Sequence, residues 1–83
     1  METVTKVQVI EPYLLEITFS NGVSRQVDLE GELYGEVFEP LREPGFFSQA
    51  RLDPELGTVV WPNGADFSPE FLYHYQSKTR ANA

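Results

Sequence analysis

The residues in this sequence that could support a reaction are few, and they stand near its C-terminal end. Asp66, Ser68 and His74 are the residue types of a nucleophilic triad. Ser68 and His74 lie six positions apart on one predicted helix, which places them on different faces and about two turns from each other. We therefore expect no hydrolytic triad, and His74 is predicted to be a solvated or partly packed helix residue.

Metal and cofactor chemistry finds little more support in the sequence. Cysteine is absent, and a single histidine excludes the His-Glu-x-x-His signature of zinc hydrolases. Asp53, Glu55 and Asp66 are residue types that bind cations, yet their spacing does not match a calcium-binding loop. Neither a phosphate-binding glycine loop nor a dinucleotide fingerprint is present. We predict no catalytic residues, no cofactor and no metal site, and therefore a protein that is not an enzyme.

Charge limits the partners that the chain can have. Thirteen acidic residues stand against six basic ones, which gives a net charge of −7. Phosphate contacts need lysine and arginine, so direct binding to nucleic acid or to an anionic membrane surface is disfavoured. A basic partner protein would be attracted. The simpler alternative is that the acidity only keeps a small protein in solution.

The length of 83 residues predicts a single domain over 1–83, with a core over about 3–77 and a flexible tail over 78–83. The apolar runs are too short for a transmembrane helix, and the polar start of the chain is unlike a signal peptide. The absence of cysteine fits a reducing compartment. We therefore expect a cytoplasmic protein.

Alternation of apolar and polar residues predicts three strands in the first part of the chain, over 3–10, 13–19 and 23–29. Asn21-Gly22 lies between two of these runs and is a strong hairpin signal. Arg25 falls on the apolar side of the third strand, so we expect it near the edge of the sheet with its head in water. The first strand carries few charges and no proline, and its open edge or the adjacent apolar face is predicted to pair with another chain, which makes a homo-oligomer an expectation.

The connection over 30–46 is harder to interpret. Leu33, Val37 and Leu41 recur at a spacing of four, which suits a helix face, but Gly35 and Pro40 interrupt it. We predict a loop with one helical turn at about Phe38–Arg42, ended by Pro44-Gly45. Its aromatic and leucine residues are expected to cover one face of the sheet.

Two further strands over 46–52 and 58–61 and a helix from about Ser68 to Ser77 complete the predicted elements. Phe71, Leu72 and Tyr75 form the apolar face of that helix. The expected fold class is α+β: a small antiparallel β-sheet of about five strands, with the short helical segment and the C-terminal helix on one face.

The stretch between the last strand and the helix is the most distinctive. Pro62, Asn63 and Gly64 suit a β-turn, Ser68 suits a helix N-cap, and Phe67 could pack against Leu72 as a hydrophobic staple. Asp66 is expected to bond exposed amides of the turn or of the helix start, and so to matter for folding first. Trp61 either anchors the core or is the centre of a recognition surface.

The same stretch carries a family resemblance. The run Trp61-Pro62-Asn63-Gly64-Ala65-Asp66 is followed by Ser68-Pro69-Glu70 and Leu72-Tyr73, and preceded by Leu41 with Phe46 or Phe47, Asp28-Leu29, Phe19-x-Asn21-Gly22 and Val7-x-Val9. With these residues, over roughly 4–73, the chain resembles the small bacterial family called domain of unknown function 2442. The resemblance implies an α+β fold without established catalytic residues. It also implies a gene beside another small gene, an arrangement like that of a toxin–antitoxin pair.

Two functions from different classes follow as hypotheses. The first is a non-enzymatic protein-interaction module, in its sharpest form the acidic antitoxin-like or regulatory partner of a small neighbouring protein. The alternative is a small-ligand or metal-binding domain that uses the loop after Trp61 and nearby carboxylates. The candidate interaction surface comprises Trp61, Pro62, Asn63, Gly64, Asp66 and His74.

Overall fold

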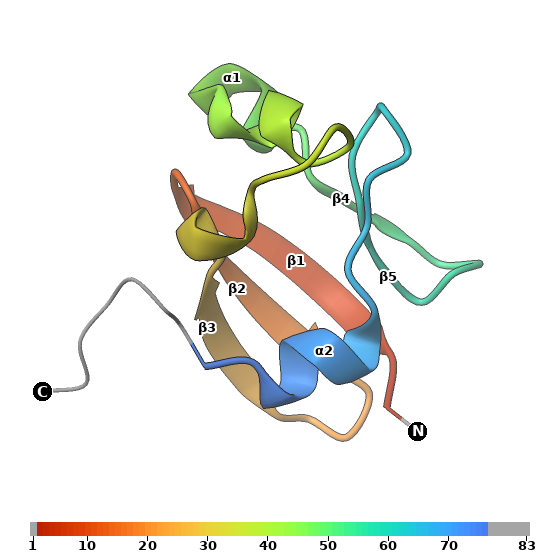
Figure 1. Ribbon diagram of the computed structural model, residues 1–83. Helices are drawn as coiled ribbons and strands as arrows, with labels where there is room; N and C mark the ends of the chain where they lie inside the picture. The colour runs from red at the N-terminus through yellow and green to blue at the C-terminus, as the bar shows by residue number, and fades with distance from the viewer. Residues whose placement is uncertain (1, 77–83) are drawn as a thin grey trace, which may run out of the picture.

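A computed structural model describes residues 2–76 of the chain. The first three strands form an antiparallel meander in the order β1-β2-β3, as Figure 1 shows. Their bounds are β1 Val4–Glu11, β2 Leu14–Phe19 and β3 Ser24–Asp28. At the predicted Asn21-Gly22 turn, the Gly22 amide donates to the Phe19 carbonyl at 2.9 Å, and Gly22 takes a positive φ of 89°. The three predicted strands and their hairpin are confirmed.

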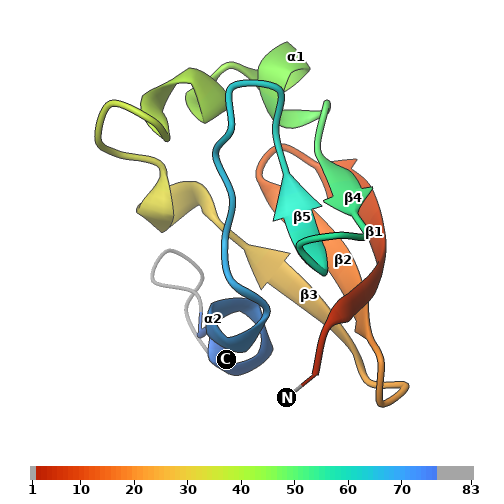
Figure 2. The ribbon, with the colours of Figure 1, turned by 90° about the vertical axis from the view of Figure 1, so that its right-hand side faces the viewer.

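The last two strands form a separate hairpin rather than extending this sheet. β4 (Arg51–Asp53) pairs antiparallel with β5 (Thr58–Val60) in a two-stranded sheet. Figure 2 shows this hairpin lying beside β1, and the Val4 amide donates to the Gly57 carbonyl at 2.8 Å. The predicted α+β class is confirmed, with its five strands divided between two sheets.

The prediction of a strand over 46–52 is wrong for its first half. Residues Pro44–Phe47 form the one-turn helix α1, and only Arg51–Asp53 are extended. Glu43 acts as the N-cap, because its carboxylate accepts from the Phe46 amide at 2.8 Å, and Pro44 occupies the first helical turn. Pro44-Gly45 therefore begins a second helix directly after the helical turn that it was predicted to end.

Two 3₁₀ turns shape the long connection. η1 spans Glu30–Glu32 and η2 spans Glu39–Arg42, so the predicted helical turn at about Phe38–Arg42 is confirmed. Between them Gly35 has a φ of 89°, and its carbonyl accepts from the Glu39 amide at 2.9 Å. This turn breaks the expected helix face. Leu33 and Leu41 are buried, whereas Tyr34 and Val37 are exposed. The prediction that the aromatic and leucine residues cover the sheet is therefore wrong for Tyr34.

Helix α2 spans Pro69–His74 and begins as predicted. The Ser68 hydroxyl accepts from the Phe71 amide at 3.0 Å, which confirms Ser68 as the N-cap. The helix ends before the predicted Ser77, which with the predicted tail over 78–83 lies outside the described residues.

Arg25 binds the C-terminal end of α2. Its guanidinium donates to the carbonyls of Leu72, Tyr73 and Tyr75 at 2.9, 2.6 and 2.6 Å. Arg25 does lie on an edge strand, because β3 ends the sheet order. The expectation that its head is in water is wrong, since the unpaired carbonyls of a helix C-terminus are good acceptors for a cation.

The core lies between the three-stranded sheet and the segments that follow β3 in the chain. Leu15, Ile17 and Phe19 of β2 are fully buried, as the period-two pattern predicts. The core extends through Phe47 of α1, Trp61 and Leu72 of α2. On the other sheet face, Glu16 pairs with Gln26 and Thr18 with Ser24, and the hydroxyls of the second pair are 2.9 Å apart. No helix within residues 2–76 is long and apolar enough to cross a membrane.

Candidate functional site

The turn after β5 has the geometry that its sequence predicts. The Gly64 amide donates to the Trp61 carbonyl at 2.9 Å, and the Trp61 amide donates to the Ala65 carbonyl at 2.9 Å. Gly64 has a φ of 88°, a backbone conformation that residues with a side chain rarely adopt. Pro62, Asn63 and Gly64 form the exposed tip of this turn.

Trp61 itself is part of the core. Its side chain is only 1% exposed, and its indole N–H donates to the Phe47 carbonyl at 2.9 Å. The ring lies 5.6 Å from that of Phe47 and 6.0 Å from that of Phe67. Of the two alternatives for Trp61, this placement agrees with the core anchor, because a buried ring offers no surface to a partner.

The Asn63 side chain fastens the turn to the long connection. Its amide nitrogen donates to the Val37 carbonyl at 2.9 Å, and its amide oxygen accepts from the Ala65 amide at 3.1 Å. Asn63 thus uses both ends of its side chain inside the molecule. The bond to Val37 holds residues 34–38 beside the stretch that leads into α2.

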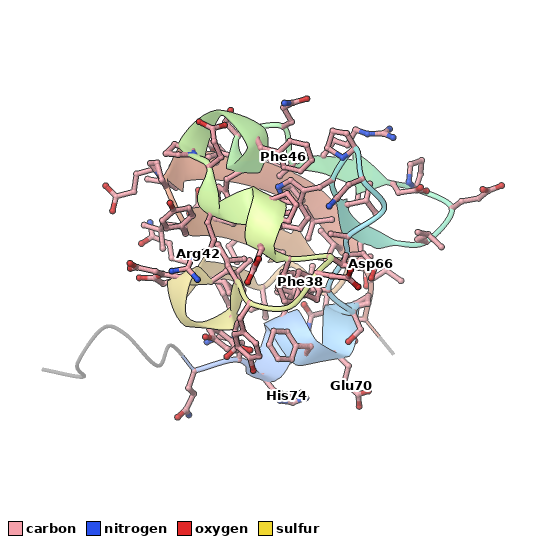
Figure 3. The ribbon with its side chains drawn as sticks, turned by 45° about the horizontal axis from the view of Figure 1, so that its top comes forward. Phe38, Arg42, Phe46, Asp66, Glu70 and His74 are labelled. Carbon is pink, nitrogen blue, oxygen red and sulfur yellow. The ribbon has the colours of Figure 1, made fainter. Side chains whose placement is uncertain are left out.

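A groove of about 370 Å³ lies where these two segments meet. We call it the acidic aromatic groove. Figure 3 shows Phe38 and Asp66 on this side of the molecule, between η2 and α2. Its lining combines four aromatic rings, two carboxylates and a serine hydroxyl, from Glu32, Tyr34, Phe38, Asp66, Phe67, Ser68 and Phe71.

A continuous series of rings forms the apolar part of this groove. Phe38 stacks on Phe67 at a centroid distance of 4.8 Å, and Phe67 stacks on Phe71 at 5.3 Å. The Phe71 ring in turn lies 5.0 Å from that of Tyr75. Phe67 and Tyr75 are the buried members, while Phe38 and Phe71 are half-buried. The ring that stacks on Phe67 at the helix start is thus that of Phe71, while the expected staple between Phe67 and Leu72 stays a prediction.

The two carboxylates of the groove are held differently. The Tyr75 hydroxyl donates to Glu32 at 3.2 Å, which orients a half-buried carboxylate. Asp66 is exposed, and no residue in the described range 2–76 donates a hydrogen bond to its carboxylate. The expected bond from Asp66 to amides of the turn or helix start is therefore not found, because Asn63 and Ser68 accept from those amides instead.

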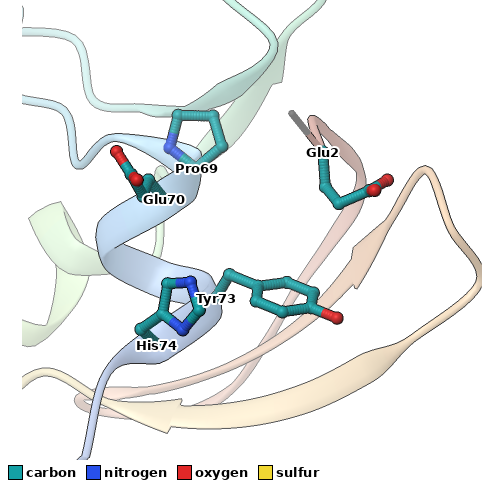
Figure 4. A pocket seen from close by; sticks show the side chains of 5 residues that line it. All are labelled: Glu2, Pro69, Glu70, Tyr73 and His74. Carbon is teal, nitrogen blue, oxygen red and sulfur yellow. The ribbon is translucent and has the colours of Figure 1, made fainter.

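His74 lies at a different place. It is exposed on α2 and lines a second hollow of about 300 Å³ with Glu2, Pro69, Glu70 and Tyr73. Figure 4 shows Glu2 and Glu70 on opposite sides of this hollow, with their carboxylates pointing apart. Within residues 2–76, no three histidine, aspartate or glutamate side chains gather closely enough to hold a metal ion.

The predicted interaction surface is thus distributed over several places. Trp61 lies in the core, Pro62, Asn63 and Gly64 at the tip of the turn, Asp66 in the groove and His74 at the second hollow. Sequence reasoning did not assign Glu32, Tyr34, Phe38 and Phe71 to a site. The signal that could have found part of it is the alternation of glutamates with aromatic residues over 30–43.

The fold and its groove define a small α+β domain with a mixed aromatic and acidic surface site. The chain belongs to the family described as protein of unknown function (DUF2442), whose model matches residues 4–77. Searches of curated proteins and of solved structures found no match to this chain.

Proposed function

We propose that this protein is a non-enzymatic protein-interaction module that binds a small basic partner protein. The observation that carries the proposal is the acidic aromatic groove, with exposed apolar side chains beside it. Tyr34, which lines the groove, is 60% exposed, and Val37, which precedes the groove residue Phe38 in the chain, is 50% exposed. Large apolar side chains exposed together are typical of binding surfaces.

The charge around the groove favours a basic partner. Residues 30–43 contain five glutamates and one cation, Arg42. Arg42 donates to the Leu33 carbonyl at 3.4 Å, so its guanidinium is partly engaged within the protein. A surface of one sign attracts a partner of the opposite sign and speeds the encounter. We therefore propose that the partner presents arginine or lysine to this face.

The finer form of the proposal is an antitoxin-like or regulatory role in the cytoplasm. Support for it comes from the resemblance, which implies a gene beside another small gene, and from the net charge of −7. An acidic protein that covers a basic partner can block whatever that basic surface binds. The protein would then act by occupying its partner, without a reaction of its own.

Co-expression with the product of the adjacent gene tests the proposal. We expect the two proteins to elute together from a sizing column, and we expect growth inhibition by the neighbour to be relieved by this protein. The complex should weaken at high salt, because exposed charges are screened. Two proteins that elute separately and leave each other's effect on growth unchanged would contradict the proposal.

The small-ligand alternative retains one specific observation, the hollow beside His74. Its two glutamates, its tyrosine and its histidine could accept hydrogen bonds from a polar molecule, or donate to one, which is typical of small ligand sites. A thermal-shift screen with metal ions and metabolites tests it, since a ligand that binds only the folded state raises the melting temperature. A flat response over the whole panel would remove this alternative.

A further inference from the structure

The acidic aromatic groove presents ring faces to an incoming group. Phe67 forms the buried base of the ring series, and Phe38 and Phe71 flank it with half-buried rings. Tyr34, the most exposed large apolar side chain in the described range, lines the same groove. The face of an aromatic ring carries partial negative charge and attracts a cation that comes within about 6 Å of the ring centre.

Carboxylates add full negative charge to this apolar lining. Glu32 is oriented by the Tyr75 hydroxyl, and Tyr75 also belongs to the ring series through its contact with Phe71. Asp66 lines the groove and receives no hydrogen bond from residues 2–76, so its oxygens can accept from a ligand. Figure 3 shows Arg42 on the far side of Phe38 from Asp66, so this cation does not reach that carboxylate.

An occupant must therefore combine positive charge with a flat apolar surface. A guanidinium group has both: it stacks on aromatic faces, and its five N–H donors can serve carboxylates on different edges. A lysine ammonium is a compact, strongly hydrated charge that uses ring faces less well. An anion would be repelled by both carboxylates, and a purely apolar side chain would leave them without new partners while removing water from them.

We propose that the acidic aromatic groove binds an arginine side chain of the partner protein, with Glu32 and Asp66 as the carboxylates that receive its guanidinium. This inference rests on the proposed interaction function and adds the residue that the groove recognises. Tyr34, an exposed residue of the groove lining, would contact an apolar residue next to that arginine.

The test is a titration of the isotope-labelled protein with a blocked pentapeptide, Gly-Leu-Arg-Leu-Gly, followed by amide chemical shifts. We expect shifts in residues 32–38 and 66–71, and binding at least fivefold tighter than that of the same peptide with citrulline, the neutral isostere of arginine. Asp66→Asn and Glu32→Gln should each weaken binding at least threefold. Glu55→Gln is the matched control, because it removes an equal charge from an exposed position in the β4–β5 turn and should leave affinity within 1.5-fold of the wild type.

Several results would overturn the inference. If the citrulline peptide, or the same peptide with lysine in place of arginine, binds as tightly as the arginine peptide, recognition of the guanidinium is excluded. An equal loss in Glu55→Gln would show attraction by net charge alone, and free arginine binding as tightly as the peptide would point to a metabolite site. If the neighbouring protein co-elutes in the wild type and in Asp66→Asn alike, the interaction function stands and the groove assignment fails. If the peptide binds as expected while no partner co-elutes, the proposed function fails and the groove assignment stands.

Discussion

The Asn63 side-chain amide donates to the main-chain carbonyl of Val37 across 26 residues of sequence. This bond joins the tip of the most distinctive turn to the segment that carries Tyr34 and Phe38. Asn63 was a candidate for direct contact with a partner, yet both of its side-chain groups are engaged within the molecule. Its contribution to binding would therefore come from fixing the wall of the groove.

Replacement of Asn63 should show this role. Asn63→Asp keeps an acceptor for the Ala65 amide but loses the donor to Val37, and it places a carboxylate against a carbonyl oxygen. We expect a loss of about 1 kcal/mol in the free energy of unfolding, measured by urea denaturation. Amide shifts should spread into residues 34–38. If the Asn63→Asp variant is as stable as the wild type, the bond to Val37 contributes nothing.

Arg25 should matter more for stability than any other cation in the described range. Arg25→Met keeps most of the apolar stem but removes every donor to the carbonyls of Leu72, Tyr73 and Tyr75. Hydrogen bonds from a charged donor are stronger than those from a neutral one. We therefore expect the free energy of unfolding, measured by urea denaturation, to fall by about 2–4 kcal/mol. Arg51→Met, at an exposed position, is the control and should change stability little. Equal effects of the two substitutions would contradict this account of the helix end.

Trp61→Phe tests the core role of the tryptophan. The smaller ring leaves a cavity beside Phe47 and Phe67, and it removes the indole donor to the Phe47 carbonyl, which still accepts from the Ala50 amide at 3.2 Å. We expect a loss of about 2–3 kcal/mol by thermal or urea unfolding. Partner binding by the folded fraction should not change. Unchanged stability with lost binding would make Trp61 a recognition residue after all.

Local patterns predicted the parts of the fold that are fixed locally. The alternation in β2, the Asn21-Gly22 turn and the Ser68-Pro69 helix start each depend on a few neighbouring residues. Phe46-Phe47 shows where such patterns fail, since two adjacent apolar residues suit a buried strand and a helix equally. The Glu43 cap and Pro44 stabilise the start of a helix here. Their stabilising effect can be recognised only when the geometry of the cap is known.

The groove was beyond local prediction for a different reason. Its wall depends on the bond from Asn63 to Val37, and the position of Glu32 depends on Tyr75, 43 residues away. The positive φ of Gly35 turns Tyr34 and Val37 outward, although their spacing with Leu33 and Leu41 suggested one buried helix face. Pairings over such distances follow from the packed fold and have no counterpart in the spacing of neighbouring residues.

Self-association through the edge of β1 stays a prediction, now confined to part of that strand. The amide of Val4 already bonds the Gly57 carbonyl, and β4 and β5 contact β1, so part of this edge is already occupied. Ile10, at the other end, is 43% exposed. We expect light scattering to show a mass that rises with protein concentration. Ile10→Lys should remove this rise, because a charge on the edge strand disfavours pairing with another chain. A sharply monomeric mass at the highest concentration would contradict it.

The final prediction separates the two roles that the sequence suggested for Asp66. Ser68, not Asp66, accepts from the Phe71 amide at the start of α2. Ser68→Ala should therefore lower the free energy of unfolding by about 1 kcal/mol. Asp66→Ala should change it by less than about 0.5 kcal/mol, as is usual for exposed side chains without structural bonds. Urea denaturation of both variants measures the contrast.

Binding should show the opposite order. Asp66→Ala removes a carboxylate from the groove, so the complex with a basic partner should weaken by roughly tenfold or more, the effect expected for losing one charged hydrogen bond. Ser68 also lines the groove, but its hydroxyl already accepts from the Phe71 amide, so Ser68→Ala should weaken binding much less than Asp66→Ala once the folded fraction is accounted for. Isothermal titration of both variants provides the comparison. If Asp66→Ala loses as much stability as Ser68→Ala and binds as well as the wild type, Asp66 supports the helix start, and its place in the groove has no functional consequence.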